Sequence, residues 1–189
     1  MKTRKWFGVS ATAALAVLAL GGMSPATADD SGSQTASFGW FGGMGGSDPR
    51  ACARGQAQLD RNVRTAINYY TLAFNAGQPR LAVEKYVGVD RNGNKTYTQH
   101  NPFAQNGPEA FIAFVVFFKG LFPDLNVRIV RTIAQCDLVM THAHITTGPT
   151  DLGNAAMDIF RFDRTGRIVE HWDAVQPVEA NSANDNTQF

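Results

Sequence analysis

The chain has 189 residues, 44% of them hydrophobic, and its 17 basic and 16 acidic residues leave a formal net charge of +1. Because the charges nearly balance and no basic stripe runs among the aromatic residues, the sequence argues against a nucleic-acid partner. A Gly-x-Ser-x-Gly elbow, a P-loop and a dinucleotide-binding glycine motif are all missing, which leaves acid–base chemistry on a small apolar molecule, or binding alone.

Residues 1–28 have the pattern of an export signal. Basic residues, Lys2 and Arg4 among them, precede an apolar run at 9–20, and Ala-Thr-Ala at 26–28 is a small-x-small cleavage pattern. The run is too short and too rich in alanine to favour a stable membrane anchor. We therefore expect the signal to be removed and the protein to be secreted or otherwise extracytoplasmic.

The rest of the chain divides into an arm, one domain and a tail. Residues 29–49 are rich in glycine and serine, which predicts a flexible arm, and its aromatic residues, such as Phe38 and Trp40, are open to docking on the domain or on a partner. Residues 50–178 are enough chain for one domain with its own core. The polar segment 179–189 is expected to be a disordered tail.

Two cysteines in an exported protein favour one disulfide, here between Cys52 and Cys136. Closing a loop of that length would stabilise the fold by about 4 kcal/mol on the chain-entropy model. Two buried free thiols are the alternative, and a catalytic thiol is less favoured than either.

The domain is predicted to contain helices first and a meander of strands after them. Apolar residues recur at helical spacing in three segments, 56–75, 80–86 and 110–118. The third segment is apolar almost all round and is therefore expected to be buried. A short strand and four longer β-like segments follow the alternation rule at 96–101, 125–134, 138–147, 154–163 and 168–176. This order predicts an α+β fold, with a strongly curved sheet wrapped around helices and a cavity inside.

Four motifs stand in order along this domain. They read Tyr-Thr-Gln-His-Asn-Pro at 97–102, Gly-Pro-Glu-Ala-Phe at 107–111, Asp-Ile-Phe-Arg at 158–161 and Gly-Arg-Ile-Val-Glu-His-Trp-Asp at 166–173. Together they resemble the SnoaL-like branch of the nuclear transport factor 2-like superfamily, over about residues 56–178. The resemblance implies a cone-shaped α+β fold in which a curved mixed sheet encloses an apolar pocket, and in which the outer sheet face often forms a dimer.

The resemblance also implies a chemistry. Members include polyketide cyclases that perform an intramolecular aldol condensation, ketosteroid isomerases and dehydratases, whereas others only bind ligands. In the cyclases an aspartate acts as a general base on a carbon acid without metal or cofactor, and Asp158 is the matching residue here. Most such cyclases are cytoplasmic, so the export signal departs from this pattern and argues against polyketide biosynthesis.

Asp158 interrupts an apolar strand, where an unpaired carboxylate would cost several kcal/mol. In a regular strand it shares a face with Ala156, Phe160 and Phe162. Desolvation among these neighbours would make the carboxylate a stronger base. The alternative role is structural, with the carboxylate capped by backbone amides or paired with Arg161 or Arg128.

His171 and Asp173 share one strand face, and Trp172 lies on the other. A two- or four-residue hairpin loop would place His171 across from Asp158, whereas a three-residue loop with a glycine bulge would place Trp172 there. The family resemblance implies that His100, at the end of the short strand, lies at the pocket rim. We therefore predict Asp158 as the base, with His171 or His100 as the acid or oxyanion donor.

Further pocket residues are predicted from the same segments. Substrate contacts are expected from Tyr97, Gln99, Phe114, His144, Phe160, Trp172 and Asp173. His142 and His144 share a strand face at a spacing that can hold a metal, and with His100 they would make a metal-dependent enzyme the weakest alternative.

The predicted function is that of an exported acid–base enzyme that uses neither metal nor cofactor. Its substrate would be a small apolar carbonyl compound, and the reaction an aldol cyclisation, an isomerisation or a dehydration. The main alternative is a non-catalytic binding module for a hydrophobic small molecule. A homodimer is one possible assembly.

Overall fold

The computed structural model describes residues 52, 53 and 55–189, so the predicted export signal and glycine-rich arm lie outside the described residues. Helix α2 spans Gln56–Tyr70 and continues as a π-helical turn, η2, over Thr71–Asn75; α3 spans Pro79–Tyr86 and α4 spans Pro108–Leu121. Gly77, with φ of 64°, ends the first helical stretch as a left-handed glycine commonly does. The three predicted helical segments are therefore confirmed.

Five strands form one mixed sheet. They are β1 (Thr98–Gln99), β2 (Asn126–Gln135), β3 (Leu138–Thr146), β4 (Asn154–Phe162) and β5 (Ile168–Pro177). Their spatial order is β1-β5-β4-β3-β2, with β1 parallel to β5 and every other pair antiparallel. The sheet is curved and does not close, and the predicted α+β fold is confirmed.

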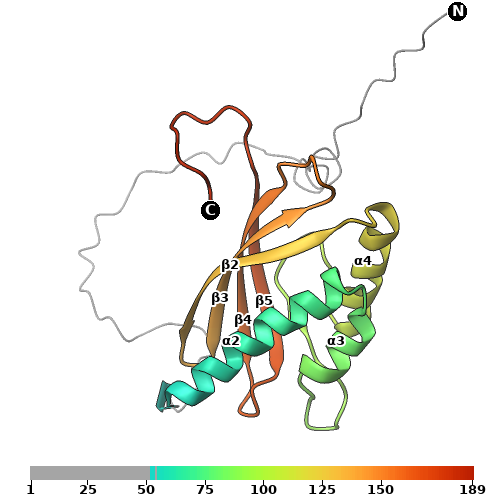
Figure 1. Cartoon of the computed structure of the whole chain (residues 1–189). Helices are drawn as coiled ribbons and strands as arrows, with labels where there is room; N and C mark the ends of the chain where they lie inside the picture. Colours follow the sequence, from blue (N-terminus) through green and yellow to red (C-terminus); the bar gives the residue numbers. More distant parts are fainter. Residues whose placement is uncertain (1–51, 54) are drawn as a thin grey trace, which may run out of the picture.

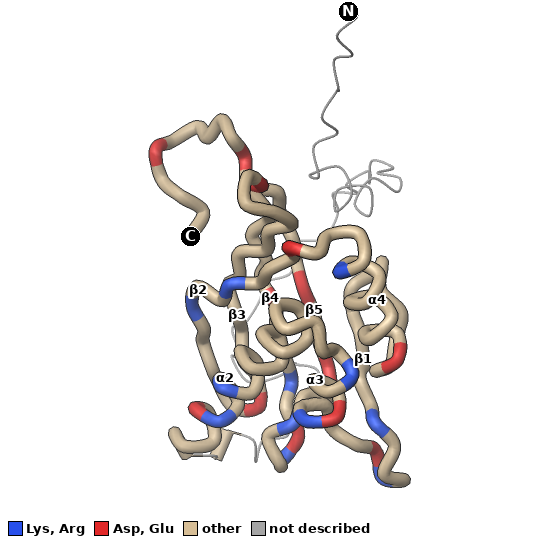
Figure 2. Tube along the Cα trace, turned by 45° about the vertical axis from the view of Figure 1, so that its right-hand side comes forward, with Lys and Arg blue, Asp and Glu red and all other residues tan. Residues whose placement is uncertain are grey.

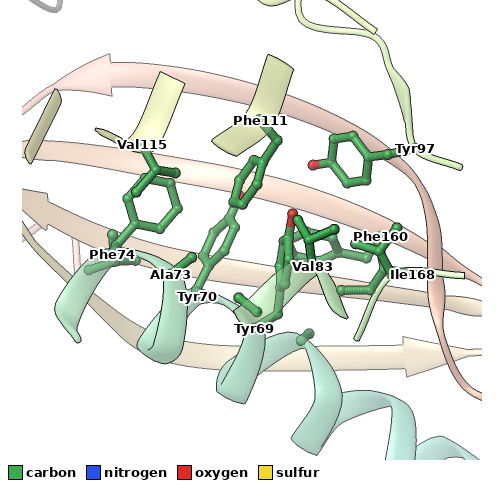
Figure 3. Close-up of a cluster of buried hydrophobic side chains, with 14 of the residues drawn as sticks. Tyr69, Tyr70, Ala73, Phe74, Val83, Tyr97, Phe111, Val115, Phe160 and Ile168 are labelled. Atoms are coloured by element: carbon green, nitrogen blue, oxygen red, sulfur yellow. The ribbon is translucent and has the colours of Figure 1, made fainter. Parts of the chain in front are cut away.

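The helices cover one face of this sheet. Figure 1 shows α2 crossing the strands, with α3 and α4 grouped beside them. Figure 3 shows Tyr70 and Phe74 pointing from this helical stretch towards Phe111 and Val115 of α4. Burial of each large aromatic side chain in such a core stabilises the fold by about 1.5–3 kcal/mol.

Helix α4 differs from its prediction on one side. Its inward face buries Phe111, Val115 and Phe118, but Val116 and Phe117 are 59% and 61% exposed. The prediction that this helix is buried all round is therefore wrong for its outer face. The reason is that α4 packs against α3 and η2 on its inner side, while Val116 and Phe117 point away from the other elements that the structure describes.

A disulfide joins Cys52 to Cys136, as favoured from the sequence. Cys136 lies in the two-residue turn between β2 and β3 and has a positive φ of 56°. The bond therefore ties the segment before α2 to the far end of the β2–β3 hairpin.

The C-terminal residues return to the sheet face that the helices leave open. The Phe189 ring lies 4.2 Å from the His144 ring and 5.4 Å from the His142 ring, measured between centroids. The expected disorder of residues 179–189 concerns motion and stays a prediction.

Charged residues are spread over the elements. Figure 2 shows acidic and basic positions interspersed along the described part of the trace. Within the described part of the chain, no helix combines the length and the hydropathy that crossing a bilayer requires.

Candidate active site

Tyr70 is the last residue of α2 and lies next to the π-helical turn. Such turns hold one more residue than an α-helical turn, and they are frequent at functional sites. Here the turn lets both Tyr70 and Phe74 face the core, at 5% and 9% exposure. Their rings meet edge-on with centroids 5.2 Å apart. The local geometry therefore aims the Tyr70 hydroxyl at the sheet.

Asp158 lies in the middle of β4 and is 3% exposed. The Tyr70 hydroxyl donates to its Oδ1 at 2.8 Å, and the Thr141 hydroxyl donates to its Oδ2 at 3.1 Å. Burial raises the pKa of Tyr70 well above its ordinary value, and the nearby Asp158 charge raises it further, so the hydroxyl stays protonated and donates.

Among the described residues, the partners of Asp158 are Tyr70, Thr141 and His171 and include no arginine. Arg161 pairs instead with Glu170, at 3.2 Å between Nε and Oε2, and Arg128 contacts His144 at 3.3 Å. The sequence-based alternative of an arginine partner for Asp158 is therefore wrong. Hydroxyl groups and an imidazole solvate the buried carboxylate in place of a cation.

His171, on β5, completes this group and is 3% exposed. Its Nε2 lies 3.0 Å from the Tyr70 hydroxyl and 3.3 Å from Asp158 Oδ1, while its Nδ1 lies 3.1 Å from Gln99 Oε1. The same Gln99 oxygen accepts a hydrogen bond from the Asn101 backbone N–H at 3.0 Å, so the amide is held with its oxygen towards the ring and His171 Nδ1 donates to it. The parallel pairing of β1 with β5 holds Gln99 opposite His171.

The β4–β5 register differs from both loop predictions. Asp158 lies directly opposite Asp173, and Phe160 lies opposite His171, because the register shifts between Arg161 and Phe162. Neither His171 nor Trp172 is therefore the direct neighbour of Asp158. His171 lies on the same face as Asp173, two residues before it on β5, and still reaches the Asp158 carboxylate.

Asp173 is the second carboxyl group of the site. Asn101 Nδ2 donates to its Oδ1 at 2.7 Å. Burial raises the pKa of Asp173, and the charge of Asp158 acts in the same direction, while His171 and the Asn101 hydrogen bond oppose the rise. Like charges directly opposite each other on neighbouring strands are destabilising.

These groups line a cavity of about 670 Å³ between the sheet, α4 and the loop after β1. Its walls are largely apolar and include Phe74, Phe111, Phe114, Phe118, Leu125 and Val127. Its polar groups include Tyr70, Tyr97, Gln99, Asp158, His171 and Asp173. A cavity of this size and character suits a small multi-ring molecule held by a few convergent polar groups.

Residues 66–171, more than half of the chain, match the SnoaL-like domain. The chain belongs to this family. The resemblance noted from the sequence motifs is thereby confirmed.

Solved structures share the fold of this chain. A candidate polyketide cyclase of Bacillus cereus has a TM-score of 0.52 at 19% identity, over 65% of this chain and 79% of that one. A candidate SnoaL-like polyketide cyclase of Jannaschia has a TM-score of 0.51 at 18% identity, over 65% of this chain and 90% of that one. No curated protein matches this chain significantly. At such identities the likeness shows the fold and not the activity.

Some predicted site residues of this SnoaL-like protein lie away from the cavity. The His100 ring stacks on Trp172, with centroids 4.5 Å apart, and its Nε2 lies 2.7 Å from Glu170 Oε1. His144 lies under Phe189 on the open sheet face and contacts the Leu152 carbonyl at 2.8 Å. The structure thus does not bring His100, Trp172 or His144 to Asp158.

The remaining predicted residues are close to the group. Tyr97, Gln99, Phe114 and Asp173 line the cavity. Phe160 is fully buried and packs beside His171, with ring centroids 4.8 Å apart, so it supports the imidazole from within the core.

The predicted metal ligands have basic neighbours. His142 Nδ1 lies 3.1 Å from Arg131, and burial and this arginine both lower the pKa of His142. An arginine beside each imidazole repels a metal cation there, so this geometry does not favour a metal site on His142 and His144. In the described residues, one set could hold an ion, with ligand atoms within 4.8 Å: Asp158, His171 and Asp173. The ligand atoms of Asp158 and His171 already form hydrogen bonds within the protein.

Asp173→Asn is expected to stabilise this SnoaL-like domain near neutral pH by about 0.5 kcal/mol. The folded chain retains a proton that the unfolded chain releases at the ordinary pKa of 3.8. Wild-type stability therefore falls as the pH rises from that value through the raised folded-state pKa, and the variant lacks this loss. Urea unfolding at about pH 7 and about pH 4 measures the difference. A variant equally destabilised at both pH values would contradict the prediction.

Proposed function

We propose that this protein is an exported acid–base enzyme that removes a proton next to the carbonyl group of a small apolar compound. The observation that carries the proposal is the convergence of Asp158, Tyr70 and His171, with polar atoms 2.8–3.3 Å apart, on the wall of an apolar cavity. The reaction would be an aldol cyclisation, an isomerisation or a dehydration. Export rests on the sequence pattern of residues 1–28.

Asp158 is the base in this proposal. The substrate C–H bond breaks, the proton moves to a carboxylate oxygen, and the electron pair is delocalised onto the carbonyl oxygen as an enolate. His171 donates a hydrogen bond or a proton to that oxygen. The Tyr70 hydroxyl contacts both the imidazole and the carboxylate and fixes their positions relative to each other. In an isomerisation the proton returns to another carbon. In an aldol cyclisation the enolate carbon attacks a second carbonyl of the same molecule, and the alkoxide that forms takes up the proton. In a dehydration the β-hydroxyl group leaves with the proton as water. His100, on the open sheet face, has no part in these steps.

A binding module for a hydrophobic small molecule is the second candidate. The observation that favours it is that both oxygens of Asp158 already accept hydrogen bonds from the protein. A carboxylate held in this way could serve to orient a ligand without accepting its proton.

Deuterium exchange separates the two functions without knowledge of the natural substrate. The protein is incubated with 2-tetralone in D₂O containing excess EDTA, and loss of the α-proton signals is followed by NMR. We expect exchange to accelerate in proportion to protein concentration, and naphthalene, which has no enolisable proton, to inhibit it competitively. Saturable binding of 2-tetralone without acceleration would favour the binding module and contradict the enzyme.

A further inference from the structure

The cavity carries an unusual balance of charge. Asp158 and Asp173 both line it, whereas none of the described residues that line it is a lysine or an arginine. His171 is the one lining side chain among them that can become positive. From this imbalance we infer that the ligand is an apolar molecule with a protonated amine, and that Asp173 binds this amine.

The inference deepens the proposed function, because it names the substrate class of the same cavity. It rests on that proposal only in the choice of cavity. Ligand affinity, rather than turnover, is the quantity that decides it.

The two carboxyl groups are placed against the usual rule for strand neighbours. Direct cross-strand pairs are stabilised by opposite charges and weakened by like charges. Here Asp158 faces Asp173 across β4 and β5, in a partly buried position where each charge is costly. Sequences that break a local rule tend to do so at functional sites. A cation bound in the cavity would relieve the repulsion between the Asp158 and Asp173 carboxylates, which no lining lysine or arginine among the described residues relieves.

Asp173 is the carboxyl group that can still accept a hydrogen bond. Both oxygens of Asp158 accept hydrogen bonds from hydroxyl groups, and that side chain is 3% exposed. Asp173 is only half-buried, and within the described chain its Oδ1 accepts from Asn101 while its Oδ2 accepts from no donor. An ammonium group at the cavity wall would supply that missing donor through a charge-assisted bond.

The aromatic walls complete the fit to an organic cation. Tyr70, Tyr97, Phe74, Phe111 and Phe114 all line the cavity. Aromatic ring faces attract a positive charge within about 6 Å of their centroid, and more strongly where water is excluded. A ligand carboxylate would instead meet two acidic groups and no arginine or lysine. The cavity therefore favours cationic over neutral ligands, and neutral over anionic ones.

Three fluorescent probes with one ring system test this order. They are 1-pyrenemethylamine, 1-pyrenemethanol and 1-pyrenecarboxylic acid, and their Kd values for the purified protein are measured by fluorescence anisotropy at about pH 7 with EDTA present. We expect the amine to bind about 10-fold more tightly than the alcohol, which is the scale of one charge-assisted hydrogen bond at a half-buried site. The acid should bind most weakly.

Two variants locate the effect. Asp173→Asn should remove most of the advantage of the amine and leave the Kd of the alcohol unchanged. Glu170→Gln is the matched control, because it removes one negative charge from the same strand, where Glu170 pairs with His100 and Arg161 away from the cavity. It should leave all three Kd values unchanged.

The outcomes are distinguishable from those of the exchange experiment. Equal affinity for the amine and the alcohol, or an amine preference that Asp173→Asn leaves intact, overturns the inference while the proposed function stands. A clear amine preference in a protein that does not accelerate exchange supports the inference and overturns the catalytic proposal alone. Failure of all three probes to bind overturns the inference, and exchange of the 2-tetralone protons still decides the proposed function by itself.

Discussion

Asp158→Asn is expected to slow protein-catalysed deuterium exchange by about a thousandfold, because a positioned general base contributes about 10²–10⁴ to the rate. Asparagine has the same shape as aspartate. It can still accept a hydrogen bond from the Tyr70 hydroxyl and contact Thr141. It cannot, however, accept a proton from carbon. The substitution therefore removes the proposed chemistry and keeps the geometry of the site.

The fold should survive this change. Loss of the charge also removes the like-charge contact with Asp173, which offsets part of the weakened hydrogen bonding. We expect a melting midpoint close to that of the wild type and an unchanged Kd for 1-pyrenemethanol. Asp60→Asn, on the exposed face of α2, is the control and should exchange at the wild-type rate. An unfolded Asp158→Asn protein would point to a structural carboxylate, and a folded, fully active one would remove the base from the proposal.

The arrangement of the fold could be predicted because its signals are local. Helical and strand periodicities were sufficient for the three helices and the four long strands. The boundaries were less predictable. The strand expected at 96–101 shortens to Thr98–Gln99, since only these residues pair with β5. The exposed face of α4 depends on what packs over it, which its own sequence does not encode.

Part of the candidate site was also visible in the sequence. Asp158 stood out because a carboxylate within an apolar strand is costly, and alternation placed His171 and Asp173 together on one face. The register could not be predicted. It depends on the shift between Arg161 and Phe162 and on the turn that follows, where Gly166 has a φ of 82°.

Tyr70 was missed for a different reason. On the apolar face of a helix, a tyrosine that donates to a buried carboxylate has the same pattern as a core aromatic residue. Its partner Asp158 is 88 residues away, so no local spacing links them. The usable signal was chemical, because a buried tyrosine hydroxyl needs a partner, and the nearby sequence offers none. His100 and Trp172 were placed at the pocket from their motifs, whereas alternation along β5 turns Trp172 to the other face of the sheet, and His100 stacks on it there.

The double variant Cys52→Ser/Cys136→Ser is expected to lower the free energy of unfolding by about 4 kcal/mol, and the melting midpoint by on the order of 15 °C. The bond closes a loop with a sequence separation of 84, and on the chain-entropy model a loop of that length restricts the unfolded chain strongly. The loop contains α2, α3, α4 and β2, so without the bond the unfolded chain gains freedom over most of the helical layer.

Function at room temperature should be spared by the same variant. Cys136 follows the end of β2, whereas Val127, at the cavity, lies near the start of that strand, about 30 Å away at 3.3 Å per residue. Exchange at 25 °C should therefore match the wild type, while thermal unfolding is displaced. Dithiothreitol is the control: it should lower the wild-type midpoint to that of the double variant and leave the variant unchanged. A double variant that melts within about 3 °C of the wild type would show that the bond constrains little of the unfolded chain.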